Sequence, residues 1–228
     1  MSRIVIPDDF PAVMAACQAY RQLIEKTQVS YYDSLPEKED RLLERIRGFE
    51  VVINIRSSTK FTERVFAECP QLKLLSIWGT GTDNVDLAAA ARHGVTVTNT
   101  PGVAAVSIAE HSLMLTLAVA RRVVAVHQRT VAGEWPRGQS VQLHGKTLGI
   151  IGLGAIGRQF ARLGQGIGMR VIAWTMHPNP ALGFELVALD ELLSASDVVS
   201  LHLRLSPETM SFLGKEQFQK MKRGAILV

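Results

Sequence analysis

Residues 147–174, TLGIIGLGAIGRQFARLGQGIGMRVIAW, carry the pattern that decides the fold. An apolar run typical of a β-strand leads into a G-x-G-x-x-G turn at Gly152, Gly154 and Gly157, and apolar residues at helical spacing follow. A second apolar run, Arg170–Trp174, closes the segment. Three glycines at these offsets recur by chance, but a strand before them and a helix after them are typical of a dinucleotide-binding β–α–β unit.

Each glycine has a separate role in such a unit. Gly152 permits a tight turn, Gly154 lets the backbone approach a pyrophosphate, and Gly157 lets the helix pack closely on the strand. The phosphates then lie against free N–H groups at the helix N-terminus, near Ala155 and Ile156, where the helix dipole favours negative charge. The alternative is a glycine-rich strand-to-helix turn that binds nothing. The surrounding pattern favours a site for a dinucleotide.

The composition excludes some classes of partner. The chain has 228 residues, of which 47% are apolar, so it is long enough for two modest domains with proper cores. Its net charge is +4, but Lys and Arg are scattered among acids and form no basic stripe with aromatic platforms. We therefore expect no nucleic-acid partner, and we expect no metal site.

The cysteines and the apolar segments indicate where the protein resides. Cys17 and Cys69 are too few for a disulfide framework, and we expect both to be buried thiols in a reducing compartment. The N-terminus has no long apolar signal segment. The longest apolar stretch, Leu113–Ala120, is flanked by charges and is much shorter than the roughly 20 residues that cross a membrane. These features predict a cytoplasmic protein without a membrane span.

Strands and helices are expected to alternate along both halves of the chain. This alternation predicts an α/β fold with parallel sheets covered on both faces. Strands are expected at Arg3–Ile6, Val29–Tyr32, Val51–Ile55, Leu74–Ile77, Thr96–Thr98, Thr147–Ile151, Arg170–Trp174, Val198–Leu201 and Ala225–Val228. Helices are expected at Phe10–Lys26, Glu37–Arg47, Thr62–Glu68, Leu87–His93, Ser107–Arg129 (long, with a buried N-terminal half), Ile156–Gly166, Leu189–Ala195 and Lys215–Lys220.

Several ordered segments together resemble the D-isomer-specific 2-hydroxyacid dehydrogenases. They are RSSTKFT at 56–62, GTGTDNVD at 79–86, TNTPGVAAVSIAEH at 98–111, GKTLGIIGLGAIG at 145–157 and SDVVSLHLRLSPET at 196–209. The resemblance covers almost the whole chain. It implies hydride transfer between a nicotinamide cofactor and C2 of a small 2-hydroxy or 2-oxo acid. It also implies two domains: a flavodoxin-like substrate domain that begins with residues 1–99 and lacks its C-terminal part here, and a doubly wound Rossmann domain over residues 100–228.

The resemblance places the substrate near two loops. Backbone N–H groups from Trp78 through Gly79 and Thr80 to Gly81 would cradle the substrate carboxylate, with Thr80 also near the nicotinamide. Ser57 and Ser58 would lie near the substrate. The alternative for residues 79–86 is a helix-capping turn, with Asp83 or Asp86 as the N-cap.

The resemblance also implies further cofactor contacts. Thr175 stands where the family usually has an Asp that bonds the ribose 2′-hydroxyl and favours NAD. A threonine can bond that hydroxyl but does not repel a 2′-phosphate, so the cofactor is NAD or NADP, with NAD favoured. A phosphate would need a basic partner, for which His177 is the nearest candidate. Residues lining the rest of the cofactor site are His202, Leu203, Arg204 and Thr209.

One departure from the family limits the expected activity. The family's Arg, Glu and His, which polarise the substrate and transfer the proton, follow the strand that matches Ala225–Val228, so no catalytic residue is assigned within this sequence. We therefore expect a C-terminally truncated chain that does not turn over substrate alone. The alternative is a non-catalytic dinucleotide-binding module, either a corepressor-like protein or a pseudoenzyme. A third interpretation, a flavodoxin-like or response-regulator-like binding protein, accounts only for residues 1–98 and leaves the glycine turn unused.

The resemblance further implies a homodimer. Residues 107–140 match the region through which the family dimerises, and Trp135 is expected to pack on the partner.

Overall fold

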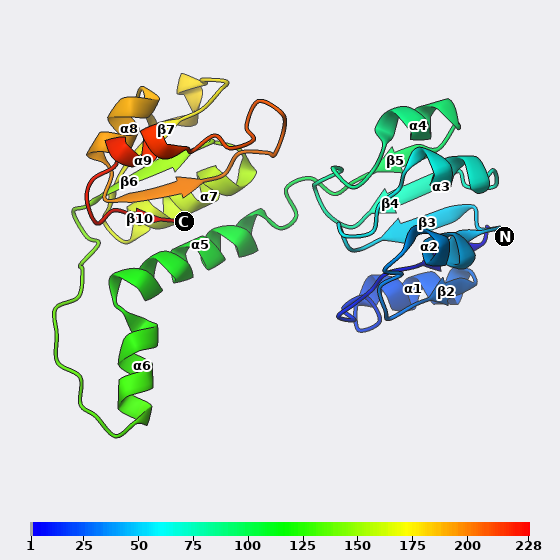
Figure 1. Ribbon diagram of the computed structural model, residues 1–228, viewed down its shortest axis with the longest axis horizontal. Coiled ribbons are helices and arrows are strands. Elements are labelled where there is room, and N and C mark those ends of the chain that lie inside the picture. The colour runs from blue at the N-terminus through cyan, green and yellow to red at the C-terminus, as the bar shows by residue number, and fades with distance from the viewer. Residues whose placement is uncertain (1) are drawn as a thin grey trace. The chain divides into compact units, whose positions relative to one another are not determined.

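The computed structural model describes residues 2–228 and divides into two compact units, Met1–Val103 and Ala104–Val228. Each unit is built on one five-stranded sheet in which every pair of neighbours is parallel. Helices pack on these sheets, as Figure 1 shows. The predicted α/β class with parallel sheets is therefore confirmed.

The first unit has the strand order β2-β1-β3-β4-β5, which is the flavodoxin-like order. All five strands were predicted to within one residue. They are β1 (Ile4–Ile6), β2 (Val29–Tyr31), β3 (Val51–Asn54), β4 (Leu74–Ile77) and β5 (Thr96–Thr98). The helices are α1 (Gln18–Lys26), α2 (Glu39–Ile46), α3 (Glu63–Glu68) and α4 (Leu87–Arg92).

The core of the first unit forms where apolar strand residues meet the helices. Val5, Val52 and Leu75 on the three central strands are fully buried, and they share one cluster with Phe61 and Phe66. When helices cover both faces of a sheet, consecutive apolar residues on a strand are all buried, because neither face meets water.

The predicted helix Phe10–Lys26 is wrong in its first half. The helix begins at Gln18, because the carboxylate of Asp9 accepts the N–H groups of Val13 and Met14 and so forms a separate turn. Cys17 then caps the helix, its Sγ accepting the N–H of Tyr20 at 3.4 Å. Cys69 is buried as predicted, but Cys17 is only half-buried, because it stands at this exposed junction.

The second unit has the strand order β10-β9-β6-β7-β8, which is the Rossmann order read from the fifth strand to the third. Its strands are β6 (Thr147–Ile151), β7 (Arg170–Trp174), β8 (Glu185–Leu186), β9 (Val198–Leu201) and β10 (Ile226–Leu227). Its other elements are α5 (Ala105–Ala120), α6 (Val123–Val131), α7 (Ala155–Gly166), the 3-10 turn Pro180–Leu182, α8 (Leu189–Ala195) and α9 (Lys215–Lys220). The sequence did not reveal β8, whose two residues are too few for an alternating pattern.

The predicted single helix Ser107–Arg129 is also wrong. It is two helices, α5 and α6, which run in clearly different directions (Figure 1). The break lies at Arg121 and Arg122, where Arg122 adopts the left-handed conformation with φ +54°. A left-handed residue cannot continue a right-handed helix, so the chain turns there.

The N-terminal half of this region is not buried all round, contrary to the prediction. α5 buries a stripe of small residues against α7, and this stripe comprises Ala105, Ala109, Ser112, Thr116 and Ala120. Small side chains let two helices approach closely, so the larger residues point away. The exposed larger residues are Val106, Ile108, Met114, Leu115, Leu117 and Val119.

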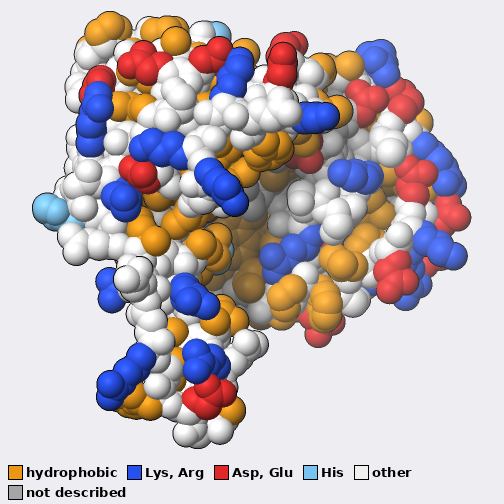
Figure 2. All heavy atoms as spheres, turned by 60° about the vertical axis from the view of Figure 1, so that its left-hand side comes forward, with side chains coloured by type: hydrophobic (Ala, Val, Ile, Leu, Met, Phe, Trp, Pro, Cys, Tyr) orange, Lys and Arg blue, Asp and Glu red, His pale blue; other side chains and the backbone are white. Residues whose placement is uncertain are grey.

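Residues 132–144 form an irregular arm after α6, as expected, and Trp135 on this arm is 81% exposed. In Figure 2 the projecting helix and its arm, at the bottom of the view, carry basic and apolar side chains side by side.

Within residues 2–228, no helix is both long and apolar enough to cross a membrane. The same residues contain no group of three His, Cys, Asp or Glu side chains that could hold a metal ion.

Candidate functional site

The glycine turn joins β6 to α7 at the carboxyl edge of the second sheet. Gly152 has φ +100°, and a β-carbon there would lie 2.6 Å from the carbonyl oxygen of His202. A β-carbon on Gly157 would lie 2.0 Å from the carbonyl oxygen of Gly152. Neither position tolerates a side chain, so these two glycines are required to form the turn.

Gly154 differs from the other two glycines of the motif. It is the N-cap of α7, and no side chain hydrogen-bonds to this helix terminus. A β-carbon on Gly154 would meet nothing within 4 Å. The first N–H groups of the helix, those of Ala155 and Ile156 among them, therefore face an open space where an anion is favoured by the helix dipole. This cradle fits a pyrophosphate.

The end of β7 lies beside this turn. Trp174 pairs with Ile151 in the sheet, and its carbonyl oxygen accepts the N–H of Gly152 at 2.8 Å. Thr175 and His177 follow immediately, and the Thr175 hydroxyl oxygen accepts the N–H of His177 at 3.4 Å. Thr175 is half-buried and His177 is exposed. The structure thus brings both predicted residues to the edge that holds the glycine turn.

His202 follows β9 and lies against the same turn. Its N–H donates to the carbonyl oxygen of Ile151 at 2.8 Å, and its Nε2 lies 2.8 Å from the hydroxyl of Ser200. The ring meets Phe160 edge-on, with 5.7 Å between centroids. Burial lowers the pKa of His202 to about 4. The ring is therefore neutral at physiological pH and is held as a packing group.

The remaining predicted cofactor residues lie in the loop after His202. Leu203 packs in an apolar cluster that also contains Trp174 and Phe212. The Thr209 hydroxyl accepts the N–H of Ser206 at 2.8 Å and donates to the carbonyl oxygen of Arg204 at 2.6 Å. This hydroxyl therefore closes the loop's own turn.

The first unit has a hollow of about 330 Å³ at the carboxyl ends of β3 and β4. Four of the six predicted substrate residues line it, namely Ser57, Trp78, Gly79 and Gly81. Asn54 and Asn84, both buried, line it as well. Ser58 instead lines a neighbouring hollow of about 320 Å³, together with Lys38 and Lys60.

The 78–81 loop shows which of its groups can face a ligand. The N–H of Trp78 donates to the carbonyl oxygen of Asn54 at 2.9 Å, so the expectation that it cradles a carboxylate is wrong. The chain continues to pair with β3 for one residue beyond the end of β4, and this pairing uses the N–H group of Trp78. The Thr80 hydroxyl donates to the carbonyl oxygen of Thr100 at 3.4 Å. Further along, Asp86 caps α4 by accepting the N–H of Ala89 at 2.8 Å, which confirms it as an N-cap.

Two acids at this edge were missed in the sequence. Asp8 and Asp9 directly follow the buried end of β1, and both are fully buried. Two adjacent acids directly after an apolar strand are the signal that could have revealed them, because the carboxyl end of a strand in such a sheet is where ligand-binding groups gather.

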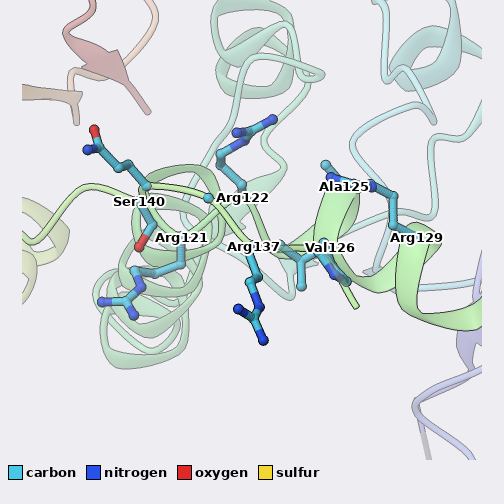
Figure 3. Close-up of a pocket in the computed structure, with 10 residues that line it drawn as sticks. Arg121, Arg122, Ala125, Val126, Arg129, Arg137 and Ser140 are labelled. Carbon is cyan, nitrogen blue, oxygen red and sulfur yellow. The ribbon is translucent and has the colours of Figure 1, made fainter. Parts of the chain in front are cut away.

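A third hollow, of about 260 Å³, lies between the α5–α6 junction and the arm (Figure 3). It is lined by four arginines, Arg121, Arg122, Arg129 and Arg137, and Arg129 is paired with Glu134 at 2.6 Å. In Figure 3 the side chains of Arg121 and Arg137 extend to one side and that of Arg122 to the other. No strand contributes to its lining, so we do not assign it to the cofactor.

Comparison with known proteins agrees with this geometry. A family model described as "D-isomer specific 2-hydroxyacid dehydrogenase, NAD binding domain" matches residues 113–228. The D-3-phosphoglycerate dehydrogenase of Methanocaldococcus jannaschii is 36% identical over 217 residues, which is 92% of this chain and 41% of that protein. The glyoxylate reductase of Korarchaeum cryptofilum is 35% identical over 86% of this chain and 62% of its own length.

Solved structures are similar over the whole chain. The pyruvate reductase of Chlamydomonas reinhardtii superposes with a TM-score of 0.81 at 32% identity, covering 100% of this chain and 68% of that structure. A phosphoglycerate oxidoreductase from Vibrio cholerae has a TM-score of 0.84 at 32% identity, covering 100% and 74%. The fold and the glycine turn therefore define an α/β dinucleotide-binding protein.

The chain belongs to the D-isomer-specific 2-hydroxyacid dehydrogenase family, which confirms the resemblance seen in the sequence. The matched model is an NAD binding domain, so the cofactor is NAD or NADP. The chain spans 41% and 62% of the length of the two relatives described above.

Proposed function

We propose that this protein is an oxidoreductase that transfers a hydride between a nicotinamide dinucleotide and C2 of a small 2-hydroxy or 2-oxo acid. The observation that carries the proposal is the turn at residues 152–157, where Gly154 leaves open space before an uncapped helix N-terminus. The bound nicotinamide supplies or accepts the hydride. The protein's own residues bind and orient the two reactants.

In this proposal the cofactor pyrophosphate binds at the glycine turn. Gly152 and Gly157 shape the turn, and the N–H groups of Ala155 and Ile156 donate to the phosphates. Thr175, at the end of β7, meets the adenosine ribose, with His177 beside it. The loop formed by residues 202–209 lines the remainder of the cofactor site. Thr175 can bond the ribose 2′-hydroxyl, whereas a 2′-phosphate would need a strongly basic partner and has His177 as its nearest candidate, so NAD is the favoured cofactor.

The proposed substrate site is the hollow at the ends of β3 and β4. The N–H groups of Gly79, Thr80 and Gly81 would cradle the substrate carboxylate, a use of consecutive backbone donors that suits an anion. The Ser57 hydroxyl would meet the same ligand. Residues 1–99 are accordingly proposed as the substrate domain and residues 100–228 as the cofactor domain. His202 is not assigned as the proton donor, because its ring is held by Ser200 and Phe160.

A single methyl group tests the cofactor site. Gly154→Ala has room for its β-carbon in the free protein, so the fold should survive, but the methyl group would occupy the space proposed for the pyrophosphate. The NADH dissociation constant should rise by about tenfold or more, a loss of one or two charged hydrogen bonds. Gly166→Ala, at the other end of α7, also meets nothing within 4 Å and is the matched control. Equal NADH affinity in both variants would contradict the assignment.

Assays of glyoxylate, pyruvate and hydroxypyruvate reduction test the activity itself. NADH binding without reduction of any of them would favour a non-catalytic dinucleotide-binding module instead.

We also propose a homodimer formed through residues 107–140. The exposed apolar side of α5 continues onto α6, where Val123, Val124, Val126 and Val131 are exposed, and then onto Trp135. Monomers rarely expose contiguous apolar surface of this extent. Sedimentation should give the mass of a dimer at micromolar concentration, and Trp135→Ala should weaken it. A monomer mass for the unaltered chain would refute the proposal.

A further inference from the structure

Two fully buried carboxylates, Asp8 and Asp9, lie directly after β1. β1 and β3 are parallel neighbours, so their carboxyl ends meet at the edge that holds the proposed substrate hollow. Acids are almost never fully buried without partners. The partners of these two carboxylates therefore show what each of them holds in place.

Asp8 binds the turn that follows β3. Its Oδ1 accepts the N–H of Ile55 at 3.0 Å, and its Oδ2 accepts the N–H of Arg56 at 3.2 Å. The side-chain amide of Asn54 also donates to Oδ2. These three donors come from the residues directly before Ser57, so one carboxylate fixes the backbone that presents the Ser57 hydroxyl to the hollow.

The same contact reaches the hollow's buried amides. Asn54 Oδ1 accepts from Nδ2 of Asn84 at 2.9 Å, and that Nδ2 also donates to the carbonyl oxygen of Thr59 at 2.9 Å. Both amides line the hollow and are almost fully buried. A chain of hydrogen bonds thus runs from Asp8 through Asn54 to Asn84, and it sets which amide atoms the hollow presents.

Asp9 binds a different segment of the chain, the turn before α1. Its carboxylate accepts the N–H of Met14 at 2.8 Å and the Tyr31 hydroxyl at 2.7 Å, and so holds the turn before α1. Its contact with the turn after β3 is a longer one, 3.7 Å to the Arg56 guanidinium. The two neighbouring acids are equally buried but hold different segments, so Asp9 is a matched control for Asp8.

We propose that Asp8 is a positioning residue for the substrate hollow, holding the turn at residues 54–57 so that Ser57 and the Asn54–Asn84 amide pair meet the 2-oxo acid in one fixed arrangement. This inference rests on the proposed function, which places the substrate there. Burial raises the pKa of Asp8, which shows that the carboxylate is held at a cost. An apolar or amide side chain would avoid this cost, but neither could accept from all three donors.

The test compares variants of the full chain by their affinity for oxamate, an unreactive mimic of a 2-oxo acid, at saturating NADH. Asp8→Asn turns one acceptor oxygen into a donor, so the oxamate dissociation constant should rise about tenfold while that of NADH stays within about twofold. Asp9→Asn should leave oxamate affinity within about twofold, because it holds another segment. The double variant Asp8→Asn/Asn54→Asp exchanges donor and acceptor and should regain part of the affinity, which a purely structural role would not predict.

A second measurement reports on the turn at residues 54–57 in the absence of ligand. Amide hydrogen exchange at Ile55 and Arg56 should be faster in Asp8→Asn and unchanged in Asp9→Asn. Unchanged exchange in Asp8→Asn, or an equal loss of oxamate affinity in Asp9→Asn, would overturn the positioning role. The unaltered chain could bind NADH but no oxamate, while Asp8→Asn still accelerates amide exchange at the turn. That result would contradict the assignment of the hollow to the substrate, and therefore also the role of Asp8 toward a 2-oxo acid. If Asp8→Asn does not fold, failure of the double variant to restore either readout would overturn the proposal.

Discussion

The hydroxyl oxygen of Ser196 lies 2.2 Å from the point that a β-carbon on Gly149 would occupy. Gly149 is in the middle of β6, the central strand of the second sheet, and the side chain of Leu192 from α8 crowds the same point at 2.6 Å. Ser196 is fully buried and donates to the carbonyl oxygen of Leu192 at 2.6 Å. This glycine therefore sets how closely α8 can approach the sheet.

Gly149→Ala should destabilise the protein, because neither Ser196 nor Leu192 can move away without disturbing the core. Overpacking a well-filled core costs about 1–3 kcal/mol. Urea unfolding measures the loss. Gly138→Ala, in the arm, meets nothing within 4 Å and should change stability by less than about 0.5 kcal/mol. Equal stability of both variants would show that α8 is free to shift.

Arg122→Gly should stabilise the protein. Arg122 has φ +54°, a conformation that costs a residue with a side chain about 1–2 kcal/mol and costs glycine almost nothing. Part of that gain is offset by about 0.4–1 kcal/mol of added entropy in the unfolded chain. The neighbouring Arg121→Gly has only the entropic loss, because Arg121 has φ −96°. Thermal unfolding should move in opposite directions for the two variants, and a shared direction would contradict the left-handed assignment.

His202 should remain neutral down to a pH of about 4, where its pKa lies because of burial. The folded pKa is below the ordinary value of 6.5, so the unfolded chain binds more protons between these values. The stability that neutral His202 contributes is therefore fully present above pH 6.5 and is lost as the pH falls through 6.5 toward 4. NMR titration of the ring protons measures the pKa directly.

His202→Gln, which cannot titrate, should flatten this part of the pH–stability curve. A ring that titrates at its ordinary value in the folded protein would show that the packing against Phe160 does not persist in solution.

Thr175→Asp should sharpen the choice between the two dinucleotides. A carboxylate at the end of β7 accepts from the ribose hydroxyls and repels a 2′-phosphate. NADPH should bind about tenfold more weakly or worse, with NADH affinity unchanged or improved. Thr175→Asn has the same shape without the charge and should alter the two affinities by similar factors. A parallel loss of NADH and NADPH affinity in Thr175→Asp would place Thr175 away from the ribose.

The sequence was sufficient to predict most strands and the glycine turn, because these depend on local patterns. The strands β4, β6, β7 and β9 were predicted to the residue, since continuous apolar runs between polar boundaries leave little freedom. The family resemblance added the order of the two units and some of the residues that line the hollow. Four of the six predicted substrate residues line one hollow for that reason.

Features that depend on distant contacts could not be predicted in this way. The helix break at Arg122 has neither glycine nor proline to mark it, and its residues fit a helical pattern as well as those around them. The N–H group of Trp78 is not free to bind a ligand, because it donates to the carbonyl oxygen of Asn54 where the chain pairs with β3 beyond the end of β4. The role of Asp8 requires knowing that β1 and β3 are neighbours, which no local pattern encodes.

The bend between α5 and α6 has a consequence for assembly. A straight helix would offer one apolar stripe that lies along a single line. The bend instead divides the exposed apolar residues into two faces with different orientations, α5 on one side of Arg122 and α6 on the other (Figure 1). A second copy that covers both faces must itself be bent in the matching sense, so a two-fold arrangement in which each copy clasps the other satisfies both faces at once. In the proposed homodimer, the left-handed conformation of Arg122 would therefore decide which symmetry brings both apolar faces of one copy against those of the other.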